Sequence, residues 1–146
     1  KYIYFPLIVI SWCAISEYDN PINEAEIKNS SLIIKEGVFM NRYCSINCLG
    51  KIVIGSNTIF GEGVKIYDHN HRYGGINNGL NIKRTGLKIG KVLIGSNCWI
   101  GSNVTILSNV EIGDNVVIGA NLLVYKSIKS GSVIVNDQNY KNLNIK

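Results

Sequence analysis

Residues 94–124 read IGSNCWIGSNVTILSNVEIGDNVVIGANLLV, and a period of six residues runs through the whole stretch. One aliphatic residue recurs at every sixth position, and an asparagine follows three residues after each of the first five. Neither an α-helix, with about 3.6 residues per turn, nor an alternating strand produces this period. The aliphatic anchors are Ile94, Ile100, Ile106, Ile112, Ile118 and Val124; the asparagines are Asn97, Asn103, Asn109, Asn115 and Asn121; a second apolar series is Cys98, Val104, Val110, Val116, Leu122 and Ile128.

A six-residue unit with one aliphatic anchor predicts a solenoid in which each unit supplies a short strand and a corner. We expect the anchors to point inward and to stack on the anchors of neighbouring coils, because one unit alone cannot bury its anchor. Asparagine and glycine suit the corners, since both tolerate the left-handed backbone region. The same spacing recurs earlier, at Ile54, Phe60 and Ile66 and more weakly at Ile34, Met40 and Ile46.

The period breaks in the middle of the chain, which predicts an excursion loop at about residues 68–88. Long loops inside compact repeats are more often functional than idle. We expect one domain over residues 1–146, with an irregular N-terminal segment over 1–30 and a tail over 129–146.

The composition agrees with an all-β chain. It has 24 Ile and 12 Val against 3 Ala, with 19 Asn and 15 Gly. Branched residues suit pleated surfaces, so a helix bundle is excluded. The net charge is +5, but the densest basic group is only Lys83, Arg84 and Lys88. A nucleic-acid-binding stripe is absent from the sequence, and a small anionic ligand fits this charge better.

The cysteines and the N-terminal stretch predict a cytoplasmic protein without a metal site. Cys13, Cys44, Cys48 and Cys98 form no C-x-x-C pair, so we expect buried free thiols in a reducing compartment. The apolar stretch from Tyr2 to Ile15 contains Pro6 and is shorter than the roughly 20 residues that a spanning helix needs. It has no clear signal-peptide pattern. The chain opens on Lys1 rather than Met, which leaves open whether residues precede it.

Four stretches, taken in order on both sides of the loop, carry a family resemblance: Val38–Asn41, Val64–His71, Ile94–Gly101 and Val117–Ala120. They resemble the hexapeptide-repeat acyltransferases, and most of all the maltose, galactoside and capsule or lipopolysaccharide O-acetyltransferases. The resemblance covers roughly residues 30–135. It implies a left-handed parallel β-helix of about five coils and a homotrimer with sites between subunits. It also implies direct acetyl transfer from acetyl-coenzyme A to a hydroxyl of a sugar or surface-polysaccharide precursor.

The resemblance assigns roles to particular residues. His71 stands where the family has its catalytic histidine, and an imidazole suits a general base because it titrates near working pH. His69 is its rival, since residues two apart on an extended segment point the same way. The acceptor residues implied are Asn41, Asp68, His69 and Trp99, and the coenzyme residues are Trp99, Ser102, Ala120, Tyr125 and Lys126.

The sequence departs from the family pattern at three places. Tyr125 replaces a usual Thr, and Asn47–Cys48 replaces the Leu-Asp pair of the maltose-type enzymes. Asn136–Tyr140 stands in place of a Gly-Asn-Pro-Ala turn. The segment Asp68–His71 is more similar to enzymes that decorate surface polysaccharides.

Three other functions remain open at this point. The first is N-acetylation of an amino sugar nucleotide or an antibiotic. The second is a zinc enzyme like the γ-class carbonic anhydrases, which would need three protein ligands from His69, His71 and either Asp68 or a cysteine. The third is a solenoid that binds a partner and catalyses nothing.

Overall fold

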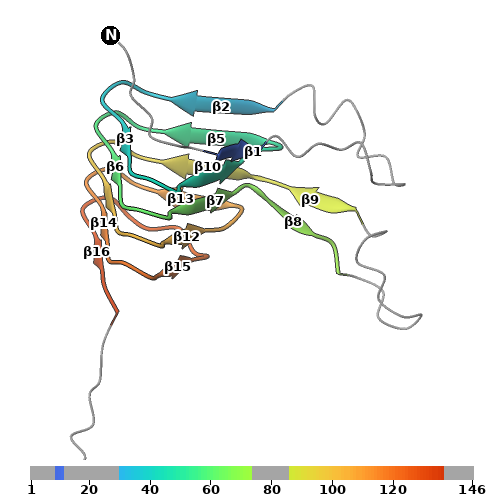
Figure 1. The fold of residues 1–146 in the computed structure, drawn as a ribbon. Helices are drawn as coiled ribbons and strands as arrows, with labels where there is room; N and C mark the ends of the chain where they lie inside the picture. The colour runs from blue at the N-terminus through green and yellow to red at the C-terminus, as the bar shows by residue number, and fades with distance from the viewer. Residues whose placement is uncertain (1–8, 12–29, 74–85, 137–146) are drawn as a thin grey trace, which may run out of the picture.

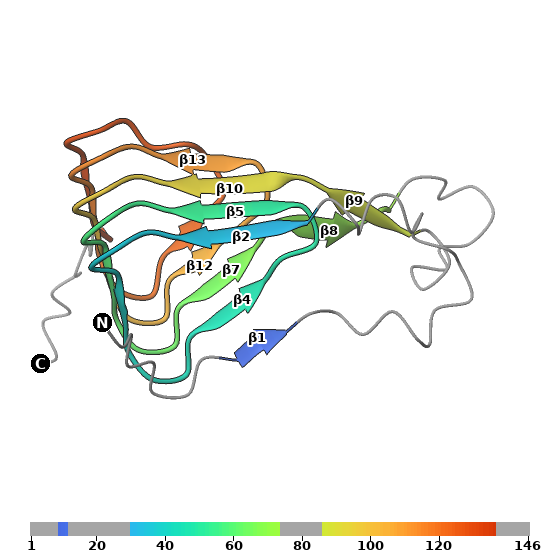
Figure 2. The same cartoon turned by 90° about the horizontal axis from the view of Figure 1, so that it is seen from above.

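The computed structural model describes residues 9–11, 30–73 and 86–136. Short strands line the three sides of a prism, and each side is one parallel sheet (Figures 1 and 2). Sheet A contains β1 (Val9–Ser11), β4 (Ser45–Asn47), β7 (Lys65–Tyr67), β12 (Thr105–Ile106) and β15 (Leu123–Val124). Sheet B contains β2 (Ser31–Ile34), β5 (Lys51–Ile54), β10 (Lys91–Ile94) and β13 (Val110–Ile112). Sheet C contains β3 (Phe39–Met40), β6 (Ile59–Phe60), β11 (Trp99–Ile100), β14 (Val117–Ile118) and β16 (Val133–Ile134).

From β2 to β15, apart from the excursion between β7 and β10, the chain visits sheets B, C and A in turn, so one coil is three strands and three corners. The register places equivalent residues directly above one another. In sheet A, Ile46 pairs with Ile66, Ile66 with Ile106, and Ile106 with Val124. This is the stacking of anchors that the six-residue period predicts.

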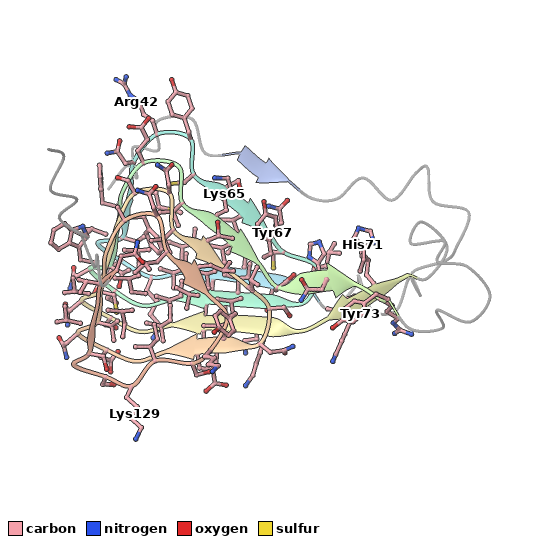
Figure 3. All side chains as sticks on the ribbon, turned by 90° about the horizontal axis from the view of Figure 1, so that it is seen from below. Arg42, Lys65, Tyr67, His71, Tyr73 and Lys129 are labelled. Atoms are coloured by element: carbon pink, nitrogen blue, oxygen red, sulfur yellow. The ribbon has the colours of Figure 1, made fainter. Side chains whose placement is uncertain are left out.

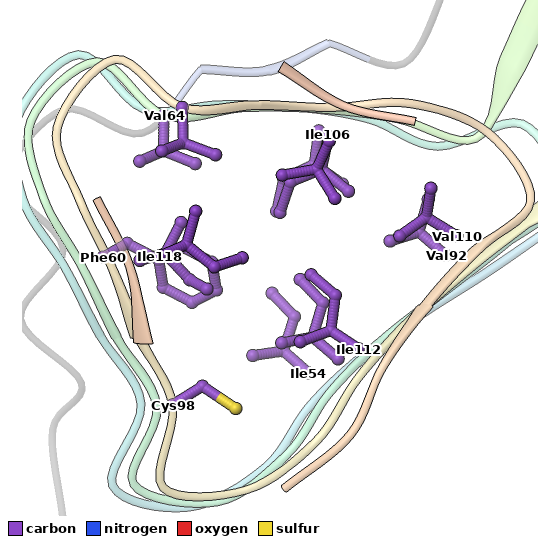
Figure 4. Close-up of a cluster of buried hydrophobic side chains, with 14 of the residues drawn as sticks. Ile54, Phe60, Val64, Val92, Cys98, Ile106, Val110, Ile112 and Ile118 are labelled. Carbon is purple, nitrogen blue, oxygen red and sulfur yellow. The ribbon is translucent and has the colours of Figure 1, made fainter. Parts of the chain in front are cut away.

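The predicted anchors form the interior of the prism (Figure 4). All six anchors of the second tract are buried, as are Ile54, Phe60 and Ile66 of the first. Met40 and Ile46 are buried too, whereas Ile34 is only partly covered. Because β-branched side chains have few rotamers, such stacks fill the narrow interior at little entropic cost.

The corners also follow the prediction. All five asparagines of the second tract have positive φ, between 56° and 63°. Glycines serve another purpose where two coils approach closely. A Cβ placed on Gly95 would lie 2.5 Å from the carbonyl carbon of Gly113 in the next coil. Close stacking of the coils therefore excludes a side chain at this position.

The excursion loop begins and ends as an antiparallel ribbon of β8 (His69–His71) and β9 (Leu87–Ile89). The ribbon projects from the corner between sheets A and B (Figure 2). The N-terminal segment expected to be irregular contains β1, which pairs with β4, and the expected C-terminal tail contains β16, which pairs with β14. Cys44 and Cys98 are buried free thiols as expected, Cys48 is only half-buried, and Cys13 lies outside the described residues.

Candidate active site

Three of the predicted site residues lie at one corner of the prism, where sheet C turns into sheet A. The amide of Asn41 donates to the carbonyl of Phe60 at 3.0 Å, which stacks Asn41 beside Gly61. A Cβ on Gly61 would lie 2.6 Å from the amide nitrogen of Ser102, and one on Gly101 would lie 2.6 Å from that of Ala120. Asn41, Ser102 and Ala120 thus belong to different levels of one edge, which we call the C–A corner.

Asp68 lies at the opposite edge of sheet A, at the base of the ribbon. Its side chain is fully buried, although aspartate is seldom buried without partners. The amide of Leu49 donates to Oδ1 at 2.9 Å and to Oδ2 at 3.0 Å, and the amide of Gly50 donates to Oδ2 at 2.7 Å. Nδ1 of His69 lies 3.0 Å from Oδ1. The Asp68 carboxylate is thus closed to solvent, and the more exposed side chain that it contacts is His69.

The main chain of Asp68 ties the two ends of the excursion loop together. Its carbonyl accepts a 2.7 Å hydrogen bond from the amide of Gly90, where the chain returns from the loop. The same carbonyl accepts a 2.7 Å hydrogen bond from Oγ of Ser108 in the following coil. The base of the ribbon is therefore fixed from both sides.

At the base of the ribbon, hydrogen bonding and burial shift the pKa values of two groups in opposite directions. Burial alone would raise the pKa of Asp68, but hydrogen bonds from His69, Leu49 and Gly50 hold the pKa of this carboxyl below its ordinary value. Burial, together with the negative charge of Asp68, raises the pKa of the Cys48 thiol to about 12. Cys48 is therefore a neutral thiol and a poor nucleophile.

The two histidines differ in their surroundings. The side chain of His69 is only 16% exposed and is held by Asp68. His71 is exposed and is paired in register with Leu87 of β9, where Nε of the neighbouring Arg72 donates to the Leu87 carbonyl at 3.0 Å. Since both histidines lie on one strand two residues apart, they share a side of the ribbon. His71 is thus presented to solvent by a ribbon whose backbone is well hydrogen-bonded.

The outer face of sheet A separates these two edges. Asn47 pairs in register with Tyr67, and the labelled side chains run from Arg42 through Lys65 and Tyr67 to His71 (Figure 3). Two further coenzyme residues of the prediction, Tyr125 and Lys126, follow β15 at the far end of this sheet and are both exposed. Nζ of Lys126 lies 5.4 Å from the centroid of the Tyr125 ring, a cation–π contact.

Trp99 lies on another face, the outer side of sheet C, and its side chain is 56% exposed. It pairs in register with Ile59 on one side and Val117 on the other. Phe39 and Val133 extend this exposed apolar row across the sheet. The sequence analysis did not predict this row; its signal is the apolar residue directly before each anchor of sheet C.

One chain therefore does not bring the predicted site together. Asn41, Ser102 and Ala120 lie at the C–A corner, Trp99 on sheet C, and the histidines on the ribbon at the other edge of sheet A. Within the described ranges no group of three or more His, Cys, Asp or Glu side chains could hold a metal ion. That part of the chain also contains no helix of a length and apolarity that could span a bilayer.

Comparisons with known proteins agree with this architecture. Residues 91–126 match the bacterial transferase hexapeptide (six repeats). A maltose O-acetyltransferase from Clostridium difficile 630 is 37% identical over 68% of this chain and 51% of its own, with a TM-score of 0.61. The acetyltransferase VCA0836 from Vibrio cholerae O1 biovar eltor, complexed with acetyl coenzyme A, is 22% identical over 68% of this chain and 54% of its own, with a TM-score of 0.60.

A variant of AntD, an N-acyltransferase from Bacillus cereus in complex with dTDP and coenzyme A, is 20% identical over 72% of this chain and 70% of its own, with a TM-score of 0.51. The second and third similarities show the fold alone. No curated protein matches the chain. The chain spans about half the length of the first two structures. The predicted fold, a left-handed parallel β-helix of hexapeptide repeats, is confirmed.

Proposed function

Because this chain belongs to the family of bacterial transferases built from hexapeptide repeats, we propose that it is an acetyl-coenzyme A-dependent O-acetyltransferase. The proposed acceptor is a hydroxyl of a sugar or of a surface-polysaccharide precursor. The similarity to a maltose O-acetyltransferase at 37% identity supports this reaction. A donor of this kind favours a cytoplasmic location.

The observation that carries the proposal is the position of two groups of residues at opposite edges of sheet A. The C–A corner presents Asn41, Ser102 and Ala120, and the ribbon at the other edge presents His71. The C–A corner is suited to a long thin ligand, because the side chains of Ser102 and Ala120 are small and Ala120 is exposed. We assign the pantetheine arm of the coenzyme to this corner and the acceptor hydroxyl to His71.

This placement requires a second copy of the chain. If copies are arranged in a ring with sheet A facing the symmetry axis, the ribbon corner of one copy meets the C–A corner of the next. A homotrimer arranged in this way has three such sites. Sheet A is suited to the contact because Leu123 is exposed on its outer face, with Thr105 and Lys65 in register beside it.

In the proposed reaction His71 accepts the proton of the acceptor hydroxyl as its oxygen attacks the thioester carbonyl carbon. The new C–O bond forms, the C–S bond breaks, and the thiol of coenzyme A leaves with a proton returned by the imidazole. Asp68 fixes the base of the ribbon through Leu49, Gly50 and Gly90, so His71 reaches the acceptor from a rigid support. Asn41 is the proposed donor to an acceptor oxygen.

Coenzyme binding is the first test. Saturating acetyl-coenzyme A is expected to raise the melting temperature through mass action on the folded state, and calorimetry should give a heat of binding. Ala120→Trp fills the exposed C–A corner and should abolish both signals. Lys129→Trp, at an exposed position on the corner between sheets B and C, is the matched control and should retain them.

The acceptor is sought in a screen of sugars, sugar nucleotides and aminoglycosides for acetyl-dependent release of coenzyme A thiol. Release with a hydroxyl acceptor supports the proposal. Release only with amines would favour N-acetylation. Absence of any coenzyme binding would contradict the transferase assignment.

A further inference from the structure

Tyr43 adopts a backbone conformation that its residue type disfavours. Its φ is 60°, in the left-handed region, and its side chain is 64% exposed. The equivalent positions at the C–A corner of later coils are Gly63, Asn103 and Asn121, which all have positive φ. Those residue types accept the conformation readily, whereas a bulky side chain there is a real outlier. Because the side chain is mostly exposed, packing offsets little of this strain, and strain of this kind is typical of functional positions.

The backbone around Tyr43 is held firmly, so the strain is not relieved by movement of the corner. The amide of Gly63 donates to the carbonyl of Arg42 at 2.9 Å, and the amide of Ser45 donates to that of Val64 at 2.8 Å. Between them, Sγ of the buried Cys44 donates to the carbonyl of Gly61 at 3.2 Å. Tyr43 and Arg42 therefore project from a fixed main chain into solvent.

Arg42 presents a positive charge at this point. Its guanidinium is exposed, and it makes no ion pair within the described part of the chain, although Glu62 stands at the same corner one coil further on. Lys65, on the same side of the molecule, donates to the main-chain carbonyl of Gly63 at 3.2 Å (Figure 3). The corner thus combines a cation and an aromatic ring, and among the described residues no carboxylate is paired with that cation.

Asn41 completes the group. Its Oδ1 accepts a 2.8 Å hydrogen bond from the amide of Arg42, which fixes the orientation of the side-chain amide. The Nδ2 group then keeps both of its hydrogens available as donors toward a ligand. A ring, a guanidinium and an oriented amide on three consecutive residues can together contact a sugar face, an anionic group and a sugar oxygen.

We propose that Tyr43 and Arg42 form, beside Asn41, a subsite for a negatively charged saccharide, with the Tyr43 ring packed on the sugar and Arg42 paired with its carboxylate or phosphate. The inference rests on the proposed function, in that the saccharide is its acceptor. It narrows the acceptor class to anionic sugars, and it assigns specificity to two residues that lie away from the histidines.

The test measures saccharide binding without coenzyme, so that it does not depend on acetyl transfer. The probes are methyl glucoside, methyl glucuronide and glucose 1-phosphate, titrated by NMR against the full chain. We expect both anionic sugars to bind more tightly than the neutral one, and added salt to reduce the difference. Similar affinities for the two anionic sugars indicate that the subsite recognises charge alone. A preference for one of them identifies the carboxylate or the phosphate as the group that the subsite recognises.

Substitutions separate the two contacts. Tyr43→Asn should lower the affinity for all three sugars by about tenfold, because stacking on the ring is lost. Its melting temperature should rise by about 2–6 °C, because the backbone strain is relieved. Tyr43→Phe keeps the ring and should bind as the wild type does. Arg42→Gln should lower the affinity for the anionic sugars only, by about tenfold. Lys129→Gln removes the same charge at a distant corner and is the matched control.

Three results would overturn the subsite: equal affinity for neutral and anionic sugars, unchanged binding by Tyr43→Asn, or an equal effect of Arg42→Gln on every probe. These results are distinguishable from failure of the proposed function. Coenzyme binding, measured separately, would still be present if only the subsite were wrong. If coenzyme binding were absent while the sugars bound as expected, the subsite would stand and the transferase assignment would fail.

Discussion

Oδ1 of Asp68 lies 3.0 Å from Nδ1 of His69, and the carboxylate that makes this contact is completely buried. The contact favours a proton on Nδ1, which leaves Nε2 as an acceptor. An imidazole oriented in this way has the chemistry of a general base. The family resemblance instead implies His71, which lies exposed two residues further along the ribbon. We therefore interpret His69 as the fixed residue that supports the ribbon, and His71 as the base.

Replacing each histidine tests this division. His71→Ala is expected to lower turnover by about 10²–10⁴, the range for loss of a general base, with little change in coenzyme affinity. His69→Ala should cost far less turnover but should lower the melting temperature, because Asp68 loses a partner. Steady-state kinetics with an acceptor that the wild type acetylates measures the turnover, and calorimetry measures the coenzyme affinity. Near wild-type turnover by His71→Ala would transfer the role of base to His69.

Asp68 should dominate the stability of the ribbon corner. Asp68→Ala leaves the amides of the buried Leu49 and the partly buried Gly50 without an acceptor, and we expect a loss of about 2–4 kcal/mol in the free energy of unfolding. Asp114, which accepts from the amide of Ser96 at an exposed corner, gives the matched control. Asp114→Ala should cost less than about 1 kcal/mol in urea unfolding.

The same carboxyl predicts how stability depends on pH. Because the pKa of Asp68 is lowered in the folded state, its contribution is complete above the ordinary pKa of an aspartate and is lost as pH falls through the lowered value. Urea unfolding of the wild type at pH 7, 5 and 3 should show this loss at the acidic end. The curve for Asp68→Asn should be flatter there. Parallel curves for the two proteins would contradict this origin of the acid sensitivity.

Glycines on adjacent coils should differ sharply in their tolerance of a methyl group. A Cβ on Gly95 would lie 2.5 Å from main-chain atoms of Gly113, whereas on Gly119 its nearest contact is 3.4 Å, to the carbonyl of Ile134. Gly95→Ala should therefore cost about 2–4 kcal/mol, since two coils must separate. Gly119→Ala should have a melting temperature close to that of the wild type. Equal melting temperatures for the two variants would mean that the coils adjust more freely than the structure indicates.

Assembly through sheet A can be tested on its outer face. Leu123→Glu places a charge on the face that the proposed ring buries, and sedimentation should then show monomers. Val133→Glu makes the same kind of change on the outer face of sheet C, where the side chain is 67% exposed, and should leave the trimer intact. A wild-type chain that sediments as a monomer at micromolar concentration would rule out a site shared between copies.

The sequence by itself determined the interior and the corners. Which residue points inward depends on the six-residue period, and the left-handed corners depend on the residue type at one position, as Asn97 and Asn115 show. Both rules are local, so they can be read without knowing which coils meet. The resemblance added the identity of the site residues but not their arrangement.

Only the tertiary structure decided which of those residues lie together. Ser102 and Ala120 share a corner because successive coils stack in register, while the break at the loop moves His71 to the other edge of sheet A. The Asp68 side chain turns inward, where it accepts hydrogen bonds from the amides of Leu49 and Gly50. These residues lie 19 and 18 positions away in sequence. A hydrogen bond over that separation depends on the packing of the coils, and a local pattern contains no signal for it.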